Sequence, residues 1–120
     1  MVALIQEQED DVVNSKRKGS AGEREFAAIL SERGFPAHRN DQRFTGGKGN
    51  PDVAAEGLEG YHFEVKRVER LNVSEAMCQA VRDANGRIPV VAHRRNREPW
   101  LVTMRFDDWF VGVKDADGKT

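Results

Sequence analysis

The chain has 120 residues, 38% of them hydrophobic, which suits one folded domain with a small core and excludes a two-lobed enzyme. No apolar run reaches the ~18–20 residues that a membrane-spanning helix needs, and residues 1–14 lack the basic and apolar regions of a signal peptide. Its single cysteine, Cys78, excludes an internal disulfide and a multi-cysteine zinc site. We therefore expect a cytoplasmic protein with no membrane partner, and a Cys78 that is a small core residue.

The net charge of −1 hides an uneven distribution of charge. Residues 1–14 contain four acids and neither Lys nor Arg, and residues 107–120 contain four acids and two lysines. Residues 15–106 therefore hold 17 Lys and Arg against 12 Asp and Glu. A basic body between acidic ends suits a nucleic-acid partner, but it suits a solvated surface of mixed charge equally well.

The hydrophobic pattern predicts a helix, three strands, a second helix and two further strands. An apolar stripe at helical spacing predicts a first helix over 20–33, which Ser20 caps and Gly34 ends. The strands are expected over 35–39, 52–56, 61–67, 88–93 and 100–106. The second helix is expected over 72–84, capped by Asn72 or Ser74 and ended by Asn85-Gly86, and a short final helix from 107 to 110. This order predicts a mixed α/β domain over residues 16–113, with a flexible acidic tail over 1–15 and a C-terminal tail over 114–120.

The strand expected over 61–67 carries the first chemical signal. Successive residues of a strand face opposite sides, so His62, Glu64 and Lys66 share one face. A short hairpin connection would bring Asp52, at the start of the preceding strand, close to Glu64. Two neighbouring carboxylates repel unless a cation lies between them, and hard oxygen ligands suit Mg²⁺ or Mn²⁺. The alternative is a solvent-facing strand with Asp52 as a turn residue.

The motif Pro51-Asp52 … Glu64-Val65-Lys66 resembles the PD-(D/E)XK nuclease superfamily. The resemblance implies an α/β fold of the restriction-endonuclease type, in which helices flank a central mixed five-stranded sheet. Together with the segment before the motif, the resemblance covers residues 16–66 well and residues 71–106 in outline.

The segment before this motif makes the resemblance narrower. Arg17-Lys18-Gly19, an acid at Glu23, a Gly34-Phe35 turn and Arg39 resemble the amino-terminal block of archaeal-type Holliday junction resolvases. That family implies a homodimeric, Mg²⁺-dependent endonuclease, with Mn²⁺ as a substitute, that resolves four-way DNA junctions by paired nicks. A PD-(D/E)XK nuclease acting on other branched or duplex DNA and a non-catalytic DNA-binding module are the alternatives. The small size and acidic tail suggest a phage or microbial source, acting in the cytoplasm.

The resemblance assigns catalytic roles to four residues: Glu23, Asp52, Glu64 and Lys66. Asp52, Glu64 and the backbone carbonyl of Val65 would hold the metal, and Lys66 would orient the attacking water. Glu23 would act on the metal through water, although its place three residues after a serine equally predicts a capping box.

The resemblance also assigns DNA contacts. Phosphates are expected to meet Arg17, Lys18, Arg39, Lys48 and Arg67. Lys48 lies in a glycine-rich loop over 46–49 that would close on the DNA backbone, and Thr45 is the hydroxyl nearest to that loop.

Three further features have open interpretations. Gln79 on the second helix either faces the site or is a plain surface residue. His62 is a proton-transfer group, a DNA contact or an ordinary exposed histidine, and the polar-out pattern favours exposure. The C-terminal aromatic residues, Trp100, Phe106, Trp109 and Phe110, fill either the core or a dimer interface.

Overall fold

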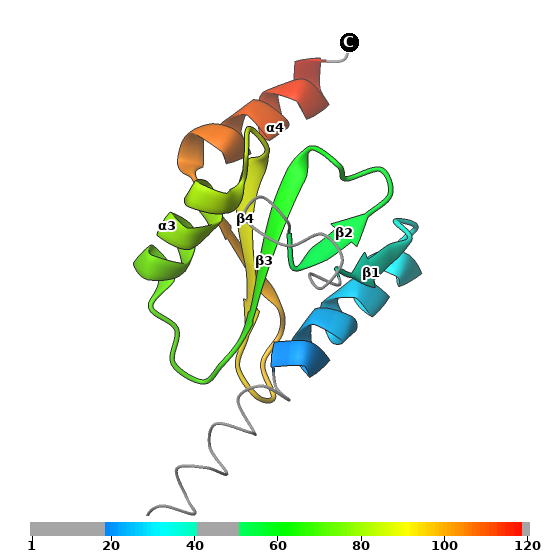
Figure 1. Cartoon of the computed structure of the whole chain (residues 1–120). Helices are drawn as coiled ribbons and strands as arrows, with labels where there is room; N and C mark the ends of the chain where they lie inside the picture. The colour runs from blue at the N-terminus through cyan, green and yellow to red at the C-terminus, as the bar shows by residue number, and fades with distance from the viewer. Residues whose placement is uncertain (1–18, 41–50, 119–120) are drawn as a thin grey trace, which may run out of the picture.

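One mixed five-stranded sheet with helices on both faces carries the fold (Figure 1). The computed structural model describes residues 19–40 and 51–118, so the predicted acidic tail and the expected contacts Arg17, Lys18, Thr45 and Lys48 lie outside the described residues. The strands, in spatial order, are β1 (Ala37–Arg39), β2 (Val53–Ala55), β3 (Tyr61–Arg67), β4 (Ile88–Arg94) and β5 (Leu101–Met104). Only β3 and β4 pair in parallel. The helices are residues 19–32, α3 (Val73–Asp83) and α4 (Phe106–Gly118).

The helix over residues 19–32 ends as expected but begins earlier. Gly34 has a φ of +97°, which a side chain would disfavour. The Gly34 N–H donates to the Ser31 carbonyl at 3.2 Å and the Phe35 N–H to the Leu30 carbonyl at 3.0 Å, so two terminal carbonyls are satisfied. The predicted cap at Ser20 is wrong, because residue 19 is already helical.

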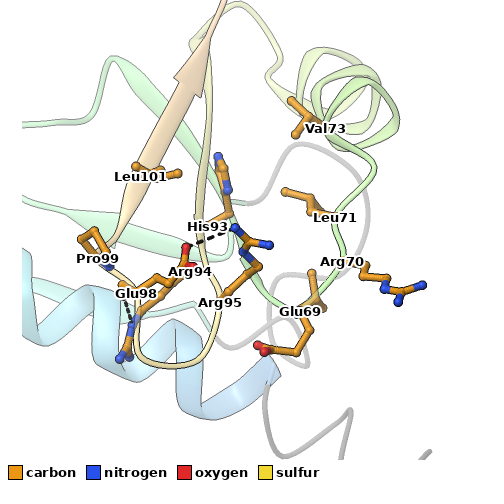
Figure 2. A pocket seen from close by; sticks show the side chains of 11 residues that line it. Glu69, Arg70, Leu71, Val73, His93, Arg94, Arg95, Glu98, Pro99 and Leu101 are labelled. Carbon is orange, nitrogen blue, oxygen red and sulfur yellow. Dashed lines mark hydrogen bonds and ion pairs between the residues drawn. The ribbon is translucent and has the colours of Figure 1, made fainter.

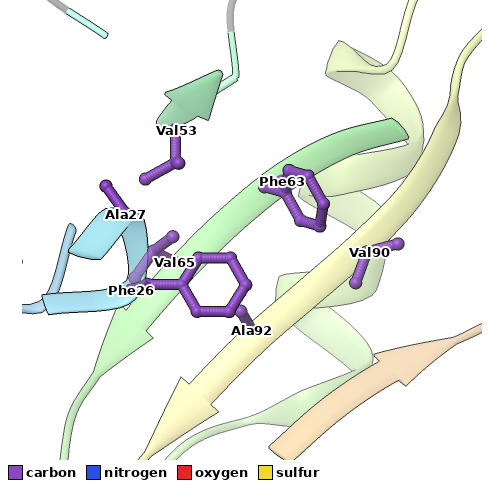
Figure 3. Close-up of a cluster of buried hydrophobic side chains, with 7 residues drawn as sticks. All are labelled: Phe26, Ala27, Val53, Phe63, Val65, Val90 and Ala92. Carbon is purple, nitrogen blue, oxygen red and sulfur yellow. The ribbon is translucent and has the colours of Figure 1, made fainter. Parts of the chain in front are cut away.

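The larger core lies between this helix and one face of the sheet (Figure 3). Its buried members are Phe26, Ala27, Val53, Phe63, Val65, Val90 and Ala92. The ring of Phe26 meets Phe63 edge-on, with 5.5 Å between ring centroids, and lies 5.3 Å from Trp100. The predicted alternation along β3 is confirmed on this face, and Trp100 belongs to the core.

Gly22 lets the helix approach the end of β3. A Cβ placed on Gly22 would lie 2.6 Å from the Cβ of Arg67, closer than two carbons can pack. Gly22→Ala is therefore expected to lower the free energy of unfolding by about 1–3 kcal/mol, as overpacking does. Urea unfolding measures this change. Gly19→Ala is the matched control, because a Cβ there meets nothing within 4 Å. Equal stability of the two variants would contradict the close approach.

Helix α3 covers the opposite face with small residues. Asn72 caps it by accepting a 3.1 Å hydrogen bond from the Glu75 N–H, and Asn85, with a φ of 51°, follows its end, so the predicted cap and stop are confirmed. Ala76 and Ala80 pack on Val91 of β4. Two alanines at the contact bring the helix backbone close to the sheet.

The C-terminal region differs from the sequence expectation. Instead of a short final turn and a tail, α4 continues to Gly118 and projects from the sheet (Figure 1). Phe106, Trp109 and Phe110 are exposed, so their placement in the core is wrong. Cys78 is exposed as well, because it lies on the outward side of α3. Within the described residues, no helix has the length and apolar character to cross a membrane.

Candidate active site

Asp52 is clamped against β3 by two hydrogen bonds. Its N–H donates to the Phe63 carbonyl at 2.8 Å, and its Oδ2 accepts from the Val65 N–H at 2.9 Å. The antiparallel hairpin thus gives Asp52 the place that the sequence predicts. The N–H and C=O of one strand residue point to the same side of the strand, so the Val65 carbonyl also points toward this edge.

The surroundings of Asp52 oppose its ionisation. Burial, and then the charge of Glu64, raise the pKa of Asp52 to about 7, with a smaller contribution from Glu23 and against the lowering effect of the Val65 N–H. A carboxyl that titrates near neutrality beside a second carboxyl is the arrangement that a divalent cation relieves.

Glu64 lies at the centre of the site, beneath α3. Its side chain is buried, with Oε1 2.9 Å from His62 Nε2 and Oε2 3.5 Å from Gln79 Nε2. The expectation that His62 is exposed is wrong: its exposed fraction is 0%. The parallel pairing with β4 and the cover of α3 bury the face of β3 that the polar pattern assigned to solvent.

Gln79 links the acid to the lysine of the motif. Lys66 Nζ donates to Gln79 Oε1 at 3.1 Å, while the amide nitrogen of Gln79 faces Glu64. Gln79 therefore points into the site instead of lying on a plain surface. Lys66 and Gln79 also border a cavity of about 210 Å³ between the end of β3 and α3.

Glu23 reaches the same region from the other side of the sheet. Arg39 Nε lies 3.4 Å from Glu23 Oε2, and Arg39 Nη2 donates to Ser20 Oγ at 3.2 Å. Burial raises the pKa of Glu23 although Arg39 lowers it, and the charge of Glu64 adds a small rise. Because Ser20 does not cap the helix, the capping-box interpretation of Glu23 loses its basis.

The donor set fits a hard divalent cation. Asp52, Glu64 and the Val65 carbonyl could supply oxygen ligands, and Mg²⁺ takes few protein ligands because it keeps several waters. Among the described residues, no three acidic, histidine or cysteine side chains are arranged so that all of them could hold one metal ion. A Glu23 that acts through water is consistent with that arrangement.

Two arginine side chains make contacts within the chain that hold its elements together. Arg67 Nη1 donates to Asn96 Oδ1 at 2.6 Å. Arg94 pairs with Glu25, which also accepts a 2.8 Å hydrogen bond from Trp100 Nε1. These contacts tie the β4–β5 turn to the end of β3 and to the helix over residues 19–32.

A groove that the sequence does not predict lies beside the site. It has a volume of about 360 Å³ and lies between the segment after β3 and the β4–β5 turn (Figure 2). Arg70 and Arg95 line it together with His93 and Leu71. In the sequence, Arg94-Arg95-Asn96-Arg97 marks the turn as basic. Only the parallel pairing of β3 with β4 brings Arg70 to the same end of the sheet.

The chain is similar to one enzyme family and to a solved structure from it. Residues 14–108 match the archaeal Holliday junction resolvase family, Hjc. The structure of Hjc from Archaeoglobus fulgidus, a Holliday junction resolvase from an archaeal hyperthermophile, shares 28% sequence identity, covers 72% of each chain and gives a TM-score of 0.54. Comparison with the curated proteins finds no similar sequence. The expected α/β fold of the restriction-endonuclease type is confirmed by this likeness.

Proposed function

Because the chain belongs to the archaeal Holliday junction resolvase family, we propose that it is a structure-selective DNA endonuclease that resolves four-way junctions by paired nicks. The single observation that carries the catalytic part is the contact of Asp52 with β3, which places its carboxyl beside the buried Glu64. A DNA-binding module without catalysis would have no use for an Asp52 whose pKa is raised by burial and by the charge of Glu64.

The metal site proposed here consists of Asp52, Glu64 and the Val65 carbonyl, with Mg²⁺ as the physiological ion and Mn²⁺ as a substitute. The ion supplies an acidified water and charge stabilisation at the scissile phosphate. Lys66, held by Gln79, orients that water and offsets negative charge on the phosphate. Glu23, set by Arg39, orders further water at the site.

The proposed DNA path follows the ends of β3 and β4. Arg39 borders the acidic site with a side chain that is 42% exposed. Arg70 and Arg95 line the groove (Figure 2), and Arg70 also borders the cavity that Lys66 borders. Contacts of this kind bind backbone phosphates without reading bases, so affinity for DNA should fall steeply with salt.

A homodimer is proposed through α4 and β5. Large apolar side chains stand exposed there: Leu101, Val102, Phe106, Trp109, Phe110 and Val111. An apolar cavity of about 540 Å³, lined by Met77, Val81 and Met104 among others, lies beside them. Exposed apolar side chains gathered on an edge strand and the helix that follows it suit an interface, and a two-fold dimer provides the two sites that paired nicks need.

The dimer proposal predicts a monomeric variant. Phe106→Asp together with Trp109→Asp is expected to weaken self-association at least about 100-fold, since buried aromatic residues dominate interface energies. Sedimentation velocity measures the change, and unaltered thermal unfolding shows that the fold survives. Val73→Asp replaces an apolar residue that is 40% exposed on α3, and its self-association should match that of the wild type. A double variant that stays dimeric contradicts this interface.

A labelled four-way junction and a duplex of matched sequence test the activity. We expect symmetric nicks in the junction in Mg²⁺, none in EDTA, and none with Asp52→Asn. Equal cutting of the duplex would keep a nuclease but remove the junction selectivity. Tight binding without cutting in Mg²⁺ or Mn²⁺ would leave a DNA-binding module.

A further inference from the structure

His62 is a buried polar residue that the proposed mechanism does not use. It lies on β3 beside Pro89 of β4, and none of its side chain is exposed. Nε2 is 2.9 Å from Glu64 Oε1, whereas Nδ1 has no hydrogen-bond partner among the described residues. Leaving a buried nitrogen unpaired costs free energy, and an apolar side chain of similar size would avoid that cost. Packing alone therefore does not explain an imidazole at this place.

We propose that His62 is a positioning residue for Glu64, and that it aims this carboxylate at the metal shared with Asp52. The inference rests on the metal site of the proposed function. An ionised carboxylate only accepts hydrogen bonds, so the hydrogen between the two groups belongs to His62 Nε2. That hydrogen bond occupies one lone pair of Oε1. The other lone pairs of the Glu64 carboxylate stay available for the metal.

His62 holds the Glu64 carboxylate in place more rigidly than Gln79 does. Gln79 Nε2 is 3.5 Å from Oε2, at the limit of a hydrogen bond, and the Gln79 side chain is itself drawn toward Lys66. His62 lies two residues away on the same strand and is completely buried. Its ring therefore cannot move with the Glu64 carboxylate when that group rotates. The terminal torsion angle of a glutamate side chain has a broad energy minimum, and a hydrogen-bond donor in a fixed position narrows the range of angles that the carboxylate adopts. Outer partners of this kind change metal affinity about 10–100-fold when they are removed.

Metal affinity without DNA tests the proposal. Mn²⁺ binding, followed by electron paramagnetic resonance of the free ion, should weaken about 10–100-fold in His62→Leu. His62→Gln places an amide nitrogen near the position of Nε2 and should regain most of the affinity. His62→Asn is too short to reach Oε1 and should bind Mn²⁺ as poorly as the leucine variant; if the leucine variant fails to fold, the asparagine and glutamine variants make the same comparison. Junction binding in EDTA should be equal in all of them.

A second background separates positioning from packing. In Glu64→Gln, which lacks the charged ligand, adding His62→Leu should cause no further loss of Mn²⁺ affinity. Wild-type Mn²⁺ affinity in His62→Leu, equal losses in both backgrounds, or a wild-type protein that does not bind Mn²⁺ would overturn the proposal. A protein that binds Mn²⁺ in a His62-dependent way but does not cut junctions would refute the proposed function and leave the role of His62 intact.

Discussion

Lys66→Met is expected to lower the rate of junction cleavage by roughly 10²–10³-fold, because it removes the cation that orients water and meets the developing phosphate charge. Lys66 Nζ is held by Gln79 at 3.1 Å, so the ammonium is already placed before DNA binds. Methionine keeps most of the length of the side chain and fills the same space. Single-turnover cleavage at saturating protein measures the chemical step, and a filter-binding assay in EDTA should find junction affinity within about threefold of the wild type, since one charge of many is lost.

Gln79→Leu gives an intermediate expectation. It leaves Lys66 in place but frees its ammonium, so cleavage should fall by about 10-fold, less than in Lys66→Met. Lys114→Met is the matched control, because Lys114 is an exposed lysine on α4, away from the acids, and its cleavage rate should equal that of the wild type. A Lys66→Met variant that cleaves at the control rate would refute the catalytic role of Lys66. A Gln79→Leu variant slower than Lys66→Met would give the glutamine a larger role than holding the lysine.

The main parts of the site could be predicted because they depend on short-range geometry. The alternation along β3 fixes which side Glu64 and Lys66 face, and a tight hairpin fixes where Asp52 meets them. Both rules act within 16 residues of chain, so no knowledge of the tertiary fold is needed. The same alternation misled the interpretation of His62, because it gives the face of a residue and not what covers that face.

The contacts that could not be predicted all join distant segments. Glu25 meets Arg94 and Trp100, about 70 residues further along the chain, and no local pattern encodes that pairing. The resemblance assigns Arg67 to a DNA contact, and the sequence does not predict that its guanidinium also donates to Asn96 Oδ1. A basic residue at the end of a strand looks the same in the sequence whether it meets a phosphate or a turn of its own chain.

The sequence also does not decide whether the aromatic residues of α4 are buried or exposed. A small domain needs large apolar residues in its core, so Phe106, Trp109 and Phe110 fitted both a core and an interface. The structure separates the two, because the helix that carries them projects from the sheet and leaves them exposed (Figure 1). The core instead relies on Phe26, Phe63 and valines packed between the sheet and the helix over residues 19–32 (Figure 3).

Asp52→Asn is expected to raise the free energy of unfolding of the metal-free protein at pH 8 by on the order of 2–4 kcal/mol. Folding raises the pKa of Asp52 from 3.8 to about 7, so the folded state binds this proton more tightly than the unfolded state. Between these two pKa values the stability of the wild type therefore falls as pH rises, and above pH 7 the whole cost is present. Asparagine keeps an oxygen that accepts the Val65 N–H and has no charge to bury.

Urea unfolding in EDTA at pH 4, 6 and 8 measures this difference. The stability gap between Asp52→Asn and the wild type should be largest at pH 8, smaller at pH 6 and smallest at pH 4, which is close to the unfolded-state pKa of 3.8. Asp115→Asn removes an exposed carboxylate on α4 and should follow the wild type at every pH. An Asp52→Asn gap of the same size at all three pH values would show that burial and Glu64 do not oppose the Asp52 charge.

Saturating Mg²⁺ should stabilise the wild type most at pH 8 and leave the stability of Asp52→Asn unchanged. The reason is that the ion binds the Asp52 carboxylate, whose burial in the charged form lowers the stability of the metal-free protein.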